Sequence, residues 1–123
     1  MRMRIGLLFV LLLGVTALFA GNLNKYAVAD QRQLTLSQQV KIGDTLVPAG
    51  DYKVLHVMEG EEHVMLFKQL DVPAKKAVVV KVKCTLKPLP EIATSNEQHY
   101  QLEDGVQVLT MLQFKGDKAQ HIF

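Results

Sequence analysis

Two histidines and two methionines lie on either side of a short turn near the middle of the chain. They are His56, Met58, His63 and Met65. The Gly60-Glu61 pair between them has the composition of a two-residue hairpin loop. If the flanking strands pair across this loop, all four side chains share one face of the sheet, because side chains alternate between faces. Imidazoles and thioethers are ligands of soft metals, so the pattern predicts a candidate copper(I) site.

The same face has a simpler interpretation, which the sequence favours. It continues into apolar residues such as Val54 and Phe67, so the methionines can pack under a loop while the histidines lie at its wet edge. Side chains on two flat neighbouring strands seldom converge on an ion unless a third element covers them. The acidic residues at the hairpin tip, Glu59, Glu61 and Glu62, supply too few oxygens for calcium and are expected to be solvated.

The sequence contains no clear catalytic motif. Cys84 is the only cysteine, so no disulfide can form within the chain, and its alternation with valines predicts a buried thiol that packs as a small apolar group. Ser37 and Ser95 are the only serines after the apolar N-terminus, and neither has a nucleophile-elbow context. Phosphate-binding glycine loops and close-spaced cysteine-histidine motifs are missing from the sequence. We therefore expect a protein that is not an enzyme and that has no cofactor.

The first twenty residues have the composition of an export signal. Arg2 and Arg4 precede an apolar run, 5–20, that is shorter than the roughly 20 residues of a membrane span. Cleavage is expected after Ala20, with Ala29 as the alternative. The predicted organisation is a signal peptide at 1–20, a flexible segment at 21–33 and a β domain at 34–123. Export to a periplasm or beyond the cell follows, and the choice between the two stays open.

After this segment, apolar and polar residues alternate with the period of β-strands. The first strand is expected over 34–42, with Gln38 as its one interruption, at a bulge or a rim. Turn residues separate the other predicted strands, which are 45–47, 52–59, 62–70, 77–87, 98–102, 106–115 and 118–123. The longest connection, 88–98, contains two prolines and is expected to be a loop.

The hairpin near Asp104-Gly105 requires a choice of register. A three-residue loop that ends at Gly105 pairs Leu102 with Val106, whereas a two-residue loop divides the apolar residues between the two faces. We therefore expect the three-residue loop. With it, the apolar residues that share the core face are Val106, Val108, Leu112 and Phe114.

Together these patterns predict a single small all-β domain. Seven or eight short strands, separated by regular turns, are typical of an antiparallel sandwich or barrel in mostly meander order, preceded here by the helix of the signal peptide. Sandwich and barrel give the same alternation, so both architectures stay open.

Charge argues against one class of partner. The chain has 14 Lys+Arg against 12 Asp+Glu, and removal of Arg2 and Arg4 with the signal peptide makes the two counts equal. This balance gives no support for nucleic-acid binding. Lys81, Lys83 and Lys87 lie on the polar face of one predicted strand, where we expect a solvated or edge-protecting surface. The alternative is a surface that faces anionic lipid or polysaccharide.

The segment Gly43-Asp-Thr-Leu-Val-Pro-Ala-Gly-Asp-Tyr-Lys-Val54 resembles an element of short secreted bacterial β-proteins of uncharacterised function. In that element a leucine, proline, alanine and glycine precede a tyrosine and a valine. Val47 separates Leu46 from Pro48 here, which departs from the tighter spacing. Those proteins run from a signal peptide through this turn into a meander that ends in a glycine-turn hairpin. The resemblance implies an exported β-protein and no particular activity.

Two classes of function remain open. The favoured class is a non-catalytic exported β-module that binds a protein, a peptide or a surface polymer through a sheet edge or the 88–98 loop. The alternative is a carrier of a small ligand or of copper, which uses the His56, Met58, His63 and Met65 face or a barrel interior. The partner is unknown, and no stable membrane span is expected after signal cleavage.

Overall fold

The computed structural model describes residues 29–123 and shows an all-β domain, as the sequence predicted. This part of the chain contains nine strands and no helix, so no helix in it is long and apolar enough to cross a membrane. The strands are β1 (Gln31–Leu36), β2 (Val40–Ile42), β3 (Thr45–Val47), β4 (Gly50–Glu59), β5 (Glu62–Gln69), β6 (Val79–Pro88), β7 (Glu97–Glu103), β8 (Val106–Gln113) and β9 (Ala119–Ile122). The predicted signal peptide and residues 21–28 lie outside the described residues.

The strands form one mostly antiparallel sheet. Its order is β1-β4-β5-β6-β9-β8-β2-β3, and β7 pairs with β8. Only β2 and β8 pair in parallel among the described strands. The expected meander order holds for β4-β5-β6 and for β7-β8-β9, whereas β1 pairs with β4 and β2 pairs with β8. No pairing within residues 29–123 joins β1 to β3, so the sheet is open along this order.

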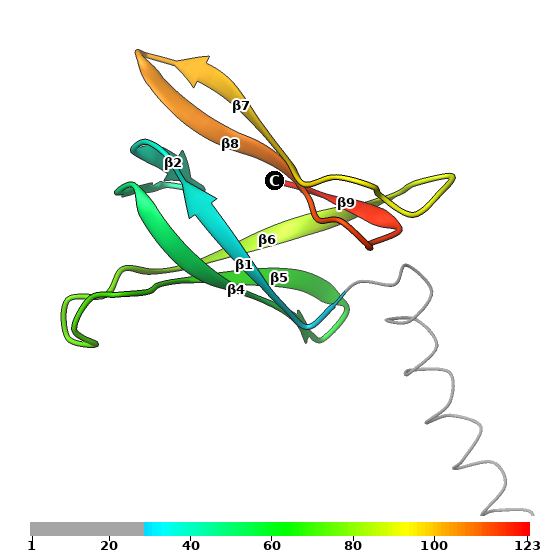
Figure 1. The fold of residues 1–123 in the computed structure, drawn as a ribbon, viewed down its shortest axis with the longest axis horizontal. Coiled ribbons are helices and arrows are strands. Elements are labelled where there is room, and N and C mark those ends of the chain that lie inside the picture. Colours follow the sequence, from blue (N-terminus) through cyan, green and yellow to red (C-terminus); the bar gives the residue numbers. More distant parts are fainter. Residues whose placement is uncertain (1–28) are drawn as a thin grey trace, which may run out of the picture.

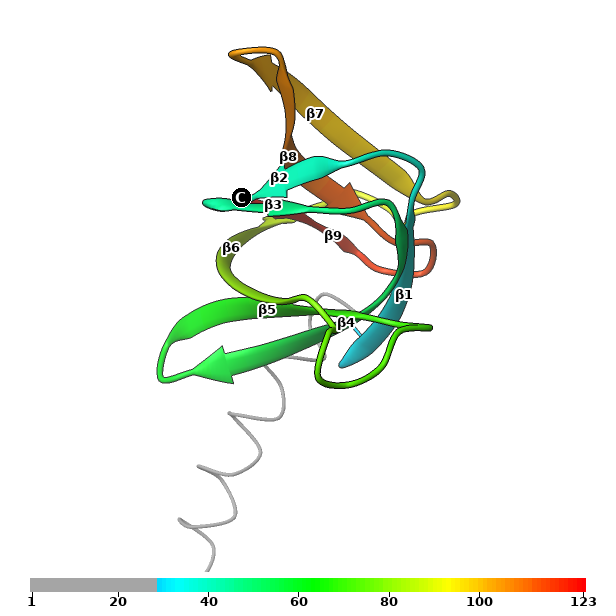
Figure 2. The same cartoon turned by 90° about the vertical axis from the view of Figure 1, so that its left-hand side faces the viewer.

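Strand β6 bends the sheet into two layers, because its two halves pair with different neighbours. Residues 79–84 pair with β5, and residues 85–88 pair with β9. Figures 1 and 2 show β1, β4 and β5 in one layer and β2, β7 and β8 in the other. Side chains of both layers form one core, and each fully buried Leu, Ile or Phe stabilises the fold by about 1.5–3 kcal/mol. The largest of these core side chains are Tyr52, Phe67, Leu36, Ile42, Met65 and Leu112.

The predicted first strand, 34–42, is two strands. β1 ends at Leu36 and pairs with β4, whereas β2 begins at Val40 and pairs with β3 and β8. Gln38 is exposed in the bend between them, where the chain passes from one layer to the other. Gln38, the one interruption that the sequence showed, therefore marks this bend, while both strands turn their apolar sides to the same core. This division accounts for nine strands where seven or eight were expected.

The prediction of a three-residue loop at 103–105 is wrong. Asp104 and Gly105 form a two-residue turn with positive φ angles of 50° and 80°, and Leu102 pairs with Gln107. A shift of register leaves Thr110 as an extra residue of β8, which is a β-bulge.

The bulge changes which residues of β8 face the core. Leu109 is buried, whereas Val106 and Val108 are only half-buried. Leu112 and Phe114 lie beyond the bulge and are buried, as predicted. The prediction assumed regular alternation along the whole strand. Because the bulge changes the face, this assumption gave the wrong register.

Candidate metal centre

The β4-β5 hairpin has the register that the sequence predicted. Glu59 pairs with Glu62 across the Gly60-Glu61 turn, and φ of Gly60 is 62°. His56 lies opposite Met65, and Met58 lies opposite His63. The four candidate ligands therefore share one face of the hairpin.

The two methionines of this face have different surroundings. Met65 is fully buried in the hydrophobic core beside Phe67, whereas Met58 is 39% exposed towards the end of β4. Packing therefore accounts for Met65, as the simpler interpretation expected. His56 is also buried, which the prediction of a wet edge did not anticipate.

Two residues from distant strands lie against His56. They are Cys84 on β6 and His121 on β9, and all three side chains are buried. Their ligand atoms, a sulfur and two ring nitrogens, lie within 4.8 Å of one another. The Sγ atom of Cys84 is 4.0 Å from Nδ1 of His121. This donor set of one thiol and two imidazoles is suited to copper or zinc.

His63 adjoins this group and completes what we call the His-Cys cluster: His56, His63, Cys84 and His121. The His63 ring stacks on the His56 ring with centroids 5.2 Å apart and planes inclined by 10°. In the β5-β6 register, His63 lies directly opposite Cys84. Three of the four histidines in the chain and its single cysteine therefore meet at one place.

The sheet topology explains why these side chains converge. β4, β5, β6 and β9 are consecutive in the sheet, and each contributes one member of the cluster. Cys84 is the last residue of β6 that pairs with β5, and the next residue already pairs with β9. The sheet bends at this point, so side chains on its inner face approach one another. β9 supplies the third element, beside β4 and β5, that side chains on a flat hairpin need in order to converge on an ion.

Two ring nitrogens of the cluster are buried without a hydrogen-bond partner among residues 29–123. They are Nε2 of His56 and Nδ1 of His63. An unsatisfied buried polar atom costs about 1–3 kcal/mol. A bound ion that accepts these lone pairs would remove that cost.

Asp117 lies behind His121 and is fully buried. Its Oδ1 atom forms an ion pair with Arg32 of β1, and its Oδ2 atom is 3.5 Å from Nε2 of His121. This contact is not a hydrogen bond, because Oδ2 is buried without a hydrogen-bond partner among the described residues. A carboxylate behind the outer nitrogen is typical of histidines that bind metals.

Burial sets the protonation of His56, His63 and Cys84 at neutral pH. It lowers the pKa of His56 to about 4, an effect that the neighbouring His121 and His63 increase. Burial and His121 also lower the pKa of His63. Both rings are therefore neutral and can offer lone pairs. Burial raises the pKa of the Cys84 thiol to about 11, so this thiol must lose a proton when it binds an ion.

The sequence analysis missed His121 and interpreted Cys84 as a packing residue only. Cys84 is buried as predicted, but its neighbours include two imidazoles. Asp117, which lies between the predicted strands 106–115 and 118–123, was not predicted to belong to a site. The sequence signal that could have found His121 is alternation in the last strand, where Ala119 and His121 share the buried face.

Two lysines of β6 form ion pairs with acidic residues at the tip of the β4-β5 hairpin. Lys81 forms an ion pair with Glu59, and Lys83 Nζ lies 3.1 Å from Oε1 of Glu62. All four side chains are exposed, so each pair contributes about 0–1 kcal/mol to stability. The pairing reduces the positive charge that an anion-binding surface on β6 would need.

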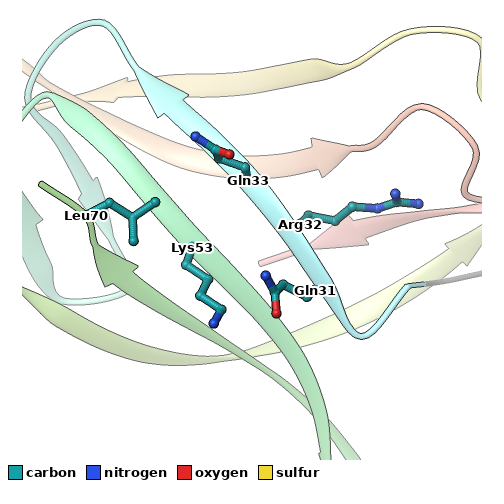
Figure 3. A pocket seen from close by; sticks show the side chains of 5 residues that line it. All are labelled: Gln31, Arg32, Gln33, Lys53 and Leu70. Atoms are coloured by element: carbon teal, nitrogen blue, oxygen red, sulfur yellow. The ribbon is translucent and has the colours of Figure 1, made fainter.

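A second polar surface lies on β1 and β4, away from the cluster. Figure 3 shows that Arg32 points away from the other labelled side chains, Gln31, Gln33, Lys53 and Leu70. The Arg32 guanidinium is engaged by Asp117. Lys53 is then the one cation left among the labelled side chains, and we assign no site to this surface.

Comparison of the chain with known protein families, curated proteins and solved structures found no match. The resemblance of the 43–54 segment to secreted bacterial β-proteins therefore stays a prediction.

Proposed function

We propose that this protein is a non-catalytic exported β-module that binds one copper(I) ion at the His-Cys cluster and carries it. The supporting observation is that His56, Cys84 and His121 lie together in the interior with their ligand atoms within 4.8 Å. The proposal develops the alternative function that the sequence suggested, with Cys84 and His121 in place of the two methionines. Binding of a protein or polymer through a sheet edge stays a prediction.

Charge balance favours copper(I) over zinc(II). A copper(I) ion bound to one thiolate and neutral imidazoles forms a centre with no net charge. Zinc(II) with the same ligands leaves one positive charge, and an uncompensated charge is costly in a buried site. The nearby Asp117 carboxylate does not alter this argument, because Arg32 already balances it.

The distances in the cluster allow an ion with small side-chain movements. Nitrogen and sulfur ligands lie about 2.0–2.3 Å from a bound ion, so neighbouring ligand atoms are about 3.5 Å apart. The Cys84–His121 separation is 4.0 Å, and all three ligand atoms lie within 4.8 Å of one another. Side-chain rotations therefore close the site without a change in the β-sheet.

The test is an anaerobic titration of the purified protein with copper(I) in the presence of a competing chromogenic chelator. We expect one equivalent to bind. Cys84→Ala and His121→Asn should each weaken binding by more than about 100-fold, because losing a ligand costs more than the roughly 10–100-fold effect of losing an outer-shell partner. His99→Ala is the matched control, because His99 lies on β7 outside the cluster.

Two results would contradict the proposal. One is equal copper(I) uptake by wild-type protein and by a Cys84→Ala variant that retains its β-sheet circular dichroism spectrum. The other is stoichiometric binding of zinc(II) with no binding of copper(I), which would replace the metal while keeping the site.

A further inference from the structure

A surface pocket adjoins one side of the His-Cys cluster. It has a volume of about 420 Å³, and its lining includes His63 and Cys84 together with Glu61, Glu62 and Lys83. The pocket lies beside the β4-β5 turn, at the bend of β6. It is large enough for a hydrated ion or for a small ligand that carries one.

The four cluster members differ in their access to this pocket. His63 is half-buried and Cys84 is 8% exposed, and both line the pocket. His56 and His121 are 5% and 1% exposed, and neither is among the residues that line it. An ion that enters here meets His63 and Cys84 before it reaches the two inner histidines.

We propose that copper(I) enters and leaves the cluster through this pocket and that His63 is the exchange ligand. This inference rests on the proposed function and describes how the same site exchanges its ion. His63 is suited to the role because its half-buried ring lines the pocket, while its Nδ1 atom is buried without a partner in the described part of the chain. Its ring also stacks on that of His56, so a small rotation transfers an ion inwards.

The exchange needs no oxidant or reductant. Copper(I) first forms a bond to the lone pair of His63 and loses a ligand of its donor. A bond to Cys84 Sγ then forms as the thiol proton passes to solvent water, and bonds to His56 and His121 form as the bond to His63 breaks. Release is the reverse sequence, in which a ligand of the acceptor replaces His63. Copper remains in the +1 state throughout.

The side chains at the mouth of the pocket support entry of a cation. Glu61 and Glu62 line the pocket, and Lys83 is paired with Glu62. These two carboxylates and one ammonium give the mouth of the pocket a net negative charge. Such a charge raises the local concentration of cations and the rate at which they bind.

The experiment compares rates with affinities for four variants: His63→Ala, His63→Met, Cys84→Ala and His99→Ala. Copper(I) transfer from the protein to a chromogenic chelator, and from the chelator to the protein, is followed by stopped-flow absorbance. His63→Ala should slow both directions by about tenfold or more, which corresponds to roughly 1.4 kcal/mol of transition-state stabilisation. Its equilibrium affinity should fall much less than that of Cys84→Ala.

His63→Met is the second variant, because it retains a soft donor at the same position. We expect it to restore most of the lost rate, which a purely structural role of the imidazole would not predict. His99→Ala should exchange copper at the wild-type rate. Unchanged or faster exchange in His63→Ala, with copper still bound, would overturn the exchange path and leave the proposed function intact. Absence of copper binding by the wild-type protein would instead refute the proposed function.

Discussion

Cys84 and His121 are 37 positions apart in the chain, yet Sγ of the first lies 4.0 Å from Nδ1 of the second. They meet because β6 leaves β5 at Cys84 and pairs with β9 from the next residue onwards. The same bend brings His56 and His63 to this place. A hairpin with two histidines becomes a candidate metal centre only through this change of strand partner.

Asp117→Asn is expected to reduce both stability and copper affinity. The substitution leaves Arg32, which is partly buried, without its ion-pair partner. Loss of a charged hydrogen-bonding partner costs about 2–3 kcal/mol, measured as the free energy of unfolding in urea. Copper(I) affinity should fall by about 10–100-fold, because a neutral amide replaces the carboxylate that lies 3.5 Å from His121 Nε2. Asp104→Asn, in the β7-β8 turn, is the control. Wild-type values of both quantities in Asp117→Asn would show that the carboxylate does not position the site.

The free energy of unfolding is expected to decrease as pH falls from about 6.5 to about 4. The folded protein holds the pKa of His56 near 4, whereas the unfolded chain has the ordinary value of 6.5. The unfolded chain therefore binds more protons in this window, and acid destabilises the fold by about 2–3 kcal/mol through this group. Urea denaturation at several pH values measures the slope. His56→Gln should flatten it and His99→Gln should not. An identical slope in His56→Gln would show that His56 does not cause this pH dependence of stability.

Copper(I) binding is expected to release one proton near neutral pH. The pKa of Cys84 is raised to about 11, so the thiol is protonated before the ion binds. The apparent affinity should rise by about tenfold per pH unit below that pKa. Chelator competition at several pH values measures this slope, and calorimetry in buffers of different ionisation enthalpy counts the protons. A slope that persists in Cys84→Ala would show that another group releases the proton.

Truncation of Leu102 is expected to change the free energy of unfolding far less than truncation of Leu109. Leu102 is 64% exposed, so Leu102→Ala should change the free energy of unfolding by less than about 0.5 kcal/mol. Leu109 is buried by the bulge of β8, and Leu109→Ala should cost about 2–5 kcal/mol. Chemical denaturation of both variants tests the register directly. The reverse order of costs would restore the three-residue loop that the sequence favoured.

Local features of the fold could be predicted because local patterns specify them. The Gly60-Glu61 turn fixes which residues of β4 and β5 lie opposite each other, since a two-residue loop allows one register. The strand Thr45–Val47 has the predicted bounds. The burial of Cys84 followed from alternation with valines, which requires only that one face of the strand meet the core.

Long-range features could not be predicted from the same patterns. The bend at Gln38 and the bulge at Thr110 both keep apolar residues on the core, so alternation is compatible with them and with the simpler structures that we expected. Neither feature has a proline or glycine at that position to reveal it.

By itself, the sequence determined that this chain forms a small all-β domain, that His56 and His63 share one face of a hairpin, and that Cys84 is buried. Only the tertiary structure decided that His121 and Asp117 join them. A strand period of two reports which face a side chain occupies, but not which strands become neighbours. That choice depends on how two layers of sheet enclose one core, and it is the bend of β6 that turns four separate positions into one candidate site.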